Sequence, residues 1–282
     1  MPDTSKRTRL PDYDNPPVVE TVLGVQFDRL PSFKIAHLGA FWNTLDTDEW
    51  PLALDAPLLP PQFEQFDKTA PWAKGFHLQL TQGPTCRLQI KNNAGDRMIQ
   101  LQNDRLHFNW LGESGDPYPR YDEVRKGFDW ALNKFREFVG QQNLGDLQPN
   151  QWEVTYLNHI PQGSVWNTPK DWNFFRPLAG VFTVDGLVEG ESFGGEWHFV
   201  IPDRRGRLHV QWNYGLKSVD NEAQNEVVRL DFTARGPIEN NGDELQPVSD
   251  GLDLGRKTIV ASFKELMSDD ANKHWGLHNA ND

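Results

Sequence analysis

Apolar and polar positions alternate clearly near the start of the chain. From Val18 to Phe27 every second side chain is apolar or threonine, which predicts a β-strand. Apolar residues then recur at helical spacing between residues 34 and 45, which predicts a helix. Residues 46–75 contain five prolines, and because proline lacks an amide donor and fixes φ, a long loop with extended pieces is expected there.

Four short strands are predicted next, separated by turn residues, at 76–82, 85–91, 97–102 and 105–111. If Asn103 and Asp104 form a two-residue hairpin loop, Gln102 pairs with Arg105. Leu101, Ile99 and Arg97 then lie opposite Leu106, Phe108 and Trp110. The other face carries Met98, Gln100, His107 and Asn109, so we expect a sheet that is covered on one side only.

A long helix is predicted from Asp122 to Val139, with one apolar stripe, Asp122 as its N-cap and Gly140 as its stop. After a polar linker at 140–150 the pattern restarts. The expected elements are a strand at 152–160, a short helix near 170–175, strands at 187–201, 207–216 and 226–235, a helix from about Leu252, and a last turn at 269–275 that Gly276 ends.

Both halves thus show the same order: strand, helical segment, antiparallel strands, long helix. The predicted class is α+β, with two similar units of antiparallel sheet, each covered by a long helix in a helix-grip or TATA-binding-protein-like pattern. The units would span 17–145 and 150–282, packed as one globule after an irregular arm at 1–16. Identity between the halves is slight, so this internal duplication rests on the order of elements.

Composition indicates the cellular compartment and the classes of partner that the protein can bind. The net charge is −12, from 28 basic and 40 acidic residues, which argues against a nucleic-acid or membrane-surface role. The basic runs at 6–9 and 204–207 are interpreted as a solvated tail and a loop tip. A single cysteine excludes an internal disulfide, and neither a secretory signal nor a membrane-spanning apolar run is visible, so we expect a cytoplasmic protein.

Several segments in a fixed order resemble a sporadically distributed family of uncharacterised bacterial proteins. They are residues 16–20 (PPVVE), 97–110 (RMIQLQNDRLHFNW), 118–121 (YPRY), 153–160 (EVTYLNHI) and 274–276 (HWG). The last helix departs from the family pattern, with Gly255-Arg256 where a histidine is expected. The family brings no activity with it. The resemblance implies an accessory role in bacteria, such as defence or toxin control.

Searches for catalytic and cofactor motifs give no match. The chain has no phosphate loop, dinucleotide-binding fingerprint or common zinc pattern, so neither cofactor nor metal is predicted. Gly190, Gly194 and Gly195 favour a bend or bulge. Asp270, His274 and His278 are spaced so that a continuous helix would place them on one face, where they could bind a metal. Gly276 lies within that stretch, so we interpret it instead as a frayed, solvated end. Cys86 lies within a predicted strand, where a half-buried structural thiol is the usual explanation.

One polar constellation remains as a candidate ligand-binding site: Asn109, Arg120, Tyr121, Glu153, Asn158 and His159. These residues could instead anchor the helix entry and satisfy backbone groups at a strand end. Glu153 and His159 share a strand face but are about 20 Å apart on an extended strand, too far for an acid–base pair.

Two functional hypotheses follow. The first is a non-catalytic binding or regulatory protein that holds a partner protein or small molecule between sheet and helix or on an aromatic patch, since the chain has 11 tryptophans. The alternative is a hydrolase that combines His159 with a carboxylate from elsewhere. Homodimerisation through a sheet edge is left open.

Overall fold

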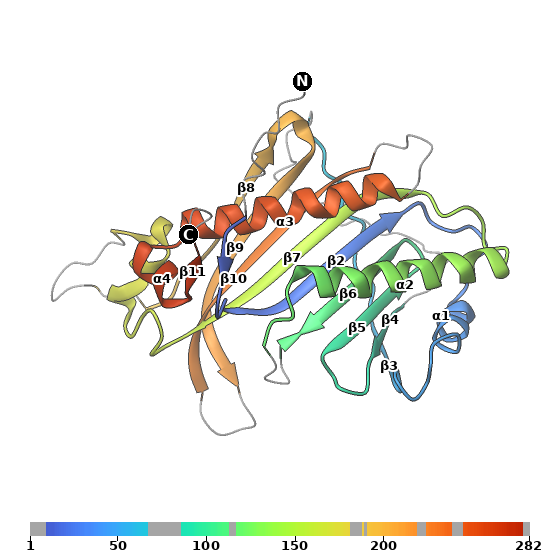
Figure 1. Ribbon diagram of the computed structural model, residues 1–282, viewed down its shortest axis with the longest axis horizontal. Coiled ribbons are helices and arrows are strands. Elements are labelled where there is room, and N and C mark those ends of the chain that lie inside the picture. Colours follow the sequence, from blue (N-terminus) through green and yellow to red (C-terminus); the bar gives the residue numbers. More distant parts are fainter. Residues whose placement is uncertain are drawn as a thin grey trace.

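One large antiparallel sheet carries two long helices on the same face (Figure 1). The computed structural model describes residues 10–66, 86–112, 117–180, 188, 191–218, 224–238 and 245–278. Within them the spatial order of the strands is β3 (Leu52–Pro57), β4 (Cys86–Lys91), β5 (Arg97–Gln102), β6 (Arg105–Leu111), β2 (Val18–Phe27), β7 (Pro149–Pro161), β10 (Gln224–Pro237), β9 (Gly206–Ser218) and β8 (Gly194–Ile201).

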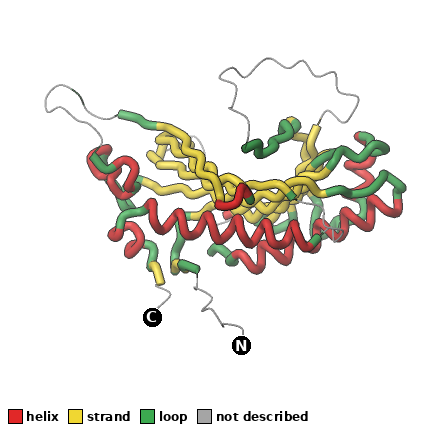
Figure 2. Tube along the Cα trace, turned by 90° about the horizontal axis from the view of Figure 1, so that it is seen from above, coloured by secondary structure: helices red, strands yellow, loops and turns green. Residues whose placement is uncertain are grey.

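The helices lie along the sheet, as Figure 2 shows from above. They are α1 (Ile35–Trp42), α2 (Tyr121–Gln141), α3 (Gln246–Leu266) and α4 (Asp269–His274), with short 3-10 turns at Pro169–Phe174, Arg176–Leu178 and Pro202–Arg204. Helix α2 packs on β2 and β6, and α3 packs on β7 and β10. Strand β1 (Asp12–Tyr13) pairs with β11 (Leu277–His278), so segments near the two ends of the chain lie side by side on the helix side. None of the described helices is long and apolar enough to cross a bilayer.

Most predicted elements agree closely with the structure. Strands β2, β5 and β6 have the predicted bounds, and the β5–β6 hairpin has the predicted register, with Gln102 opposite Arg105 and Ile99 opposite Phe108. The predicted strand at 76–82 lies outside the described residues, as do Thr85, which would begin the next strand, and Gly190.

Several other boundaries differ from the prediction. The proline-rich stretch contains a strand, β3, which ends at Pro57 on the sheet edge, where a missing amide donor is tolerated. Strand β8 begins at Gly194 and α3 at Gln246. The N-cap of α2 is Arg120, not Asp122, and α2 runs past Gly140 until Asn143 takes a left-handed φ of 51°.

Helix α3 approaches the sheet closely at Trp152. An added Cβ on Gly251 of α3 would lie 2.2 Å from Cδ1 of the Trp152 ring, and one on Gly236 of β10 would lie 2.6 Å from Cζ2. Trp152 is only 2% exposed. The indole therefore lies flat against backbone that only glycine leaves open, so helix and strands can contact it directly.

The face opposite the helices is polar, but it is not simply exposed, which corrects the expectation of a sheet covered on one side. Met98, Gln100, His107 and Asn109 are all buried. Residues 58–66, here called the strap, cross this face. Its backbone is held by glutamine side chains: Gln102 donates to the Leu59 carbonyl at 3.0 Å and accepts from the Leu59 amide at 3.1 Å. Gln26 holds Gln62 in the same way, at 2.8 and 3.2 Å.

Candidate functional site

The sheet divides the predicted constellation into two groups. Asn158 alternates with His159 along β7, so the two side chains point to opposite faces. Arg120 and Tyr121 lie at the start of α2, on the side of Asn158. Asn109 and Glu153 lie with His159 on the polar face. The six residues therefore do not form one site, because the alternation of strand positions places a sheet between them.

Arg120, Tyr121 and Asn158, on the helix side of the sheet, line one pocket. It lies between the start of β2, the start of α2, the middle of α3, and β7. We call it the helix-face pocket. Its walls are mainly aromatic and aliphatic, and its polar groups are few. The lining residues are Pro11, Asp12, Tyr13, Pro16, Val18, Tyr118, Arg120, Tyr121, Tyr156, Asn158, Arg256, Ile259, Val260 and Phe263. A mostly apolar hollow with a few convergent polar groups is the usual form of a small-molecule site.

Two arginines supply the positive charge of this pocket. Arg120 donates to the Asp12 carboxylate at 3.0 Å and to the Tyr13 carbonyl at 2.7 Å. Arg256 stacks over the Tyr121 ring, 4.5 Å from its centroid, and lies 3.5 Å from Asp122 at the protein surface. Stacking leaves the guanidinium edge able to donate further hydrogen bonds.

Tyrosine hydroxyls are further polar groups of the pocket. Tyr118 donates to or accepts from Tyr156, with their oxygens 3.2 Å apart, and Tyr121 donates to Asp253 at 2.9 Å. Burial raises the pKa of both Tyr121 and Tyr156. These phenols are therefore neutral at physiological pH and act as hydrogen-bonding groups without adding negative charge.

Asn158 has a structural task at the base of the pocket. Its amide nitrogen donates to the carbonyl of Leu230 on β10 at 3.0 Å. The side chain is 3% exposed. This contact agrees with the interpretation that Asn158 satisfies a backbone group, although the residue also lines the pocket.

A buried charge network lies on the polar face around Glu64 of the strap, which the sequence analysis missed. Arg235 approaches the Glu64 carboxylate at 2.9 Å, His209 at 2.8 Å, and Arg207 also pairs with it. Burial alone would raise the pKa of Glu64, but the hydrogen bond from His209 and the charge of Arg235 outweigh it and lower the pKa to about 2. The network ties strap to sheet. Arg207 lies in β9, in agreement with the strand predicted at 207–216, but its side chain is 21% exposed, which corrects the interpretation of 204–207 as a solvated loop tip at this residue.

Glu153 belongs to the same network. It lies 3.2 Å from Arg235 and 3.6 Å from Nε2 of His107. Burial lowers the pKa of His107 to about 4, although the Glu153 charge opposes that shift. Asn109, the third predicted residue here, donates to Glu20 at 2.5 Å and accepts from Gln100 at 2.9 Å. Glu153 is largely buried but lines a polar hollow on this face, whereas His107 is buried and does not line it.

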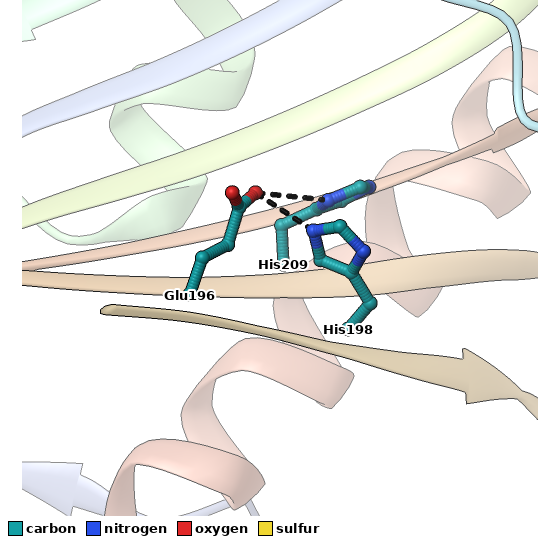
Figure 3. A group of neighbouring side chains, drawn as sticks. All are labelled: Glu196, His198 and His209. Carbon is teal, nitrogen blue, oxygen red and sulfur yellow. Dashed lines mark hydrogen bonds and ion pairs between the residues drawn. The ribbon is translucent and has the colours of Figure 1, made fainter. Parts of the chain in front are cut away.

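A third cluster lies near the sheet edge, where Figure 3 shows Glu196 and His198 of β8 beside His209 of β9. Oε1 of Glu196 lies 2.7 Å from Nε2 of His198 and 3.8 Å from Nδ1 of His209. The spacing Glu-x-His on a strand was a usable signal, since it places both side chains on one face. That His209 joins these two side chains could not be predicted without the register between β8 and β9.

The structure gives no support to two other candidates from the sequence, the Asp270, His274 and His278 group and the Cys86 thiol. Helix α4 ends at His274, and His278 lies in β11, where it contacts Asp14 at 2.6 Å, so Asp270, His274 and His278 do not share a helix face. Burial, with the nearby Asp55 carboxylate, raises the pKa of the Cys86 thiol, which is the opposite of what a nucleophile requires.

The tryptophans are mostly core residues. Trp50, Trp166 and Trp172 are at most 2% exposed, and among the tryptophans that the structure describes only Trp197, at 39%, is exposed. The proposed aromatic binding patch therefore loses most of its support. Tryptophan enrichment here reflects core packing beneath the helices.

Compared with known proteins, the chain matches no family model and none of the curated sequences. Functional inference therefore rests on the geometry of the two sheet faces.

Proposed function

We propose that this protein is a non-catalytic binding protein that holds an amphipathic organic anion in the helix-face pocket. The observation that carries the proposal is the combination of aromatic walls with two arginines, Arg120 and Arg256, in one hollow. Apolar walls favour the body of such a ligand by burying its surface, and a guanidinium pairs with a carboxylate or sulfonate through parallel hydrogen bonds.

The charges around the pocket support an anion over a cation. Asp12 is the one acidic residue among the lining residues, and Arg120 already contacts it at 3.0 Å. Within the described residues the ion pair of Arg256 is longer, at 3.5 Å from Asp122, and because Asp122 is largely exposed that pair is weak. Arg256 is thus the group that an incoming anion can use.

Strain at Arg120 is consistent with a binding role. Its backbone has φ 74° and ψ 158°, a conformation that residues with a Cβ rarely adopt. Such strain costs of order 1–3 kcal/mol and tends to occur at ligand clamps. The conformation directs the Arg120 side chain toward Asp12 and Tyr13 at the pocket wall.

The proposal includes an internal duplication in which β2 corresponds to β7 and α2 to α3. The strand order supports it, because β2 and β7 lie at the centre with β6 and β10 outside them. The pairing of β2 with β7 is antiparallel, as a two-fold axis between two such units requires. On this proposal the pocket lies between the two units of a helix-grip scaffold, because its lining residues come from both.

The setting proposed is the one that the family resemblance implies, an accessory system of bacteria concerned with defence or toxin control. A non-catalytic protein that binds a small ligand could regulate such a system. The hydrolase alternative has less support. It needs a carboxylate from elsewhere beside His159, because Glu153 lies too far along the same strand and is engaged by Arg235 and His107.

Fluorescence titration with 1-anilinonaphthalene-8-sulfonate, an aromatic sulfonate, tests the proposal. Arg256→Gln should weaken binding by about tenfold or more, since hydrogen bonds to charged groups contribute about 1.5–3 kcal/mol. Lys257→Gln is the matched control, because Lys257 is exposed on the same helix and does not line the pocket. It should leave binding unchanged. Equal effects of the two substitutions would show that the probe does not use the pocket.

A further inference from the structure

The β8–β9 pairing gathers three metal-ligating side chains on the polar face. His198 lies directly opposite His209, with ring centroids 4.5 Å apart. Glu196 precedes His198 by two positions and so lies on the same face of β8. One ligand atom from each residue lies within 4.8 Å of the other two, as Figure 3 illustrates.

The hydrogen bonding of His209 orients it as a ligand. Its Nε2 lies 2.8 Å from Oε1 of Glu64, a carboxylate that can only accept, so Nε2 carries the ring proton. Arg235 also lies 3.3 Å from Nε2, but it can only donate, and the shorter contact decides the tautomer. The lone pair of His209 is then on Nδ1, the atom that faces Glu196.

Glu64 provides the kind of support that metal-binding histidines commonly have. Its side chain is 3% exposed, and Arg235 and Arg207 hold it in place. A carboxylate behind a ligating imidazole fixes the ring and strengthens the ligand. In contrast, Glu196 and His198 are about half-exposed, at 50% and 51%, so an ion can enter from solvent.

We propose that Glu196, His198 and His209 bind a divalent transition-metal ion of the Zn²⁺ class, through Oε1, Nε2 and Nδ1 respectively. Two imidazoles with one carboxylate are a zinc-type ligand set, and the hard ions Mg²⁺ and Ca²⁺ prefer all-oxygen sites. Metal–ligand bonds of about 2.0–2.1 Å in a tetrahedron separate ligand atoms by roughly 3.3 Å. The two separations from Oε1 of Glu196, 2.7 and 3.8 Å, lie on either side of that value, and the two histidine atoms lie within 4.8 Å of each other, so small side-chain movements suffice.

Binding involves proton displacement and no redox change. Nε2 of His198 and Oε1 of Glu196 share a proton in their 2.7 Å contact, and the metal replaces that proton, which leaves Nε2 for Nδ1 or for solvent. Three protein ligands leave a further coordination position for water. Glu196 and His209 also line a polar hollow together with Arg229, Thr233 and Gln211.

Competition between the full-length protein and a chromophoric Zn²⁺ chelator tests the site, with Co²⁺ absorption spectra as a second readout. The wild type should bind one Zn²⁺, and Co²⁺ should give the strong visible bands of a four-coordinate site. His198→Gln should weaken Zn²⁺ binding at least tenfold and abolish those bands. Because His198 is exposed, this variant is expected to fold.

His278→Gln is the matched control, since His278 also forms an exposed pair with a carboxylate, at 2.6 Å from Asp14. It should bind Zn²⁺ as the wild type does. Glu64→Gln should weaken binding by roughly 10–100-fold through loss of support for His209, provided circular dichroism shows a folded protein. Wild-type binding no tighter than that of His198→Gln, or equal loss in His278→Gln, would overturn the proposal.

Discussion

Arg120 donates a hydrogen bond of 2.7 Å to the backbone carbonyl of Tyr13, which connects the first turn of α2 to the paired strand β1. The backbone of Arg120 has a φ of 74° in this arrangement. The side-chain contact and the strained backbone occur in the same residue, at the wall of the helix-face pocket.

Comparing Arg120→Gly with Arg120→Ala isolates that strain. Both substitutions remove the guanidinium, but only glycine adopts the conformation without penalty. We expect Arg120→Gly to be more stable than Arg120→Ala by about 1–3 kcal/mol in urea denaturation. In an ordinary helix position glycine is less stable by about 0.5–1 kcal/mol. If Ala were the more stable of the two, the backbone at residue 120 would not be strained.

The Trp152 contact predicts opposite effects for two glycine-to-alanine substitutions in helices. Gly251→Ala places a Cβ 2.2 Å from the indole and should destabilise the fold by about 1–3 kcal/mol, because the core must shift. Gly140→Ala, in α2, meets nothing within 4 Å and should stabilise by up to about 1 kcal/mol. Denaturant midpoints measure both. A neutral Gly251→Ala would mean that α3 does not lie this close to Trp152.

Apolar residues at every second position predicted most strands, and apolar residues at helical spacing predicted both long helices. These spacings arise because each element buries one face. The β5–β6 register followed from the Asn103-Asp104 loop alone. What could not be predicted depends on long-range pairing. Glu64 reaches His209 only because glutamine side chains hold the strap across the sheet. The opposite faces of Asn158 and His159, in contrast, follow from the alternation of positions along one strand.

His107 predicts a specific loss of stability in acid. Burial lowers its folded pKa from the usual 6.5 to about 4. Above pH 6.5 the imidazole is neutral in both states, whereas between pH 6.5 and 4 the unfolded chain gains a proton that the folded protein excludes. Stability from this group is therefore lost as pH falls through that window, by roughly 3 kcal/mol.

His107→Gln should remove that component of the pH dependence. The difference in unfolding free energy between wild type and variant should shrink by roughly 3 kcal/mol from pH 7 to pH 4, as measured by denaturation at each pH. A difference that stays constant with pH would contradict the buried, neutral state of His107.

Native mass spectrometry of the protein purified from its own cells tests the binding proposal most directly. The comparison is with Val260→Trp, which fills the helix-face pocket, and with Lys257→Trp, which adds the same side chain at an exposed position on α3. We predict a co-purifying anionic small molecule in the wild type and in Lys257→Trp, and its loss in Val260→Trp. A bare wild-type mass, or the same adduct in all three proteins, would contradict the account.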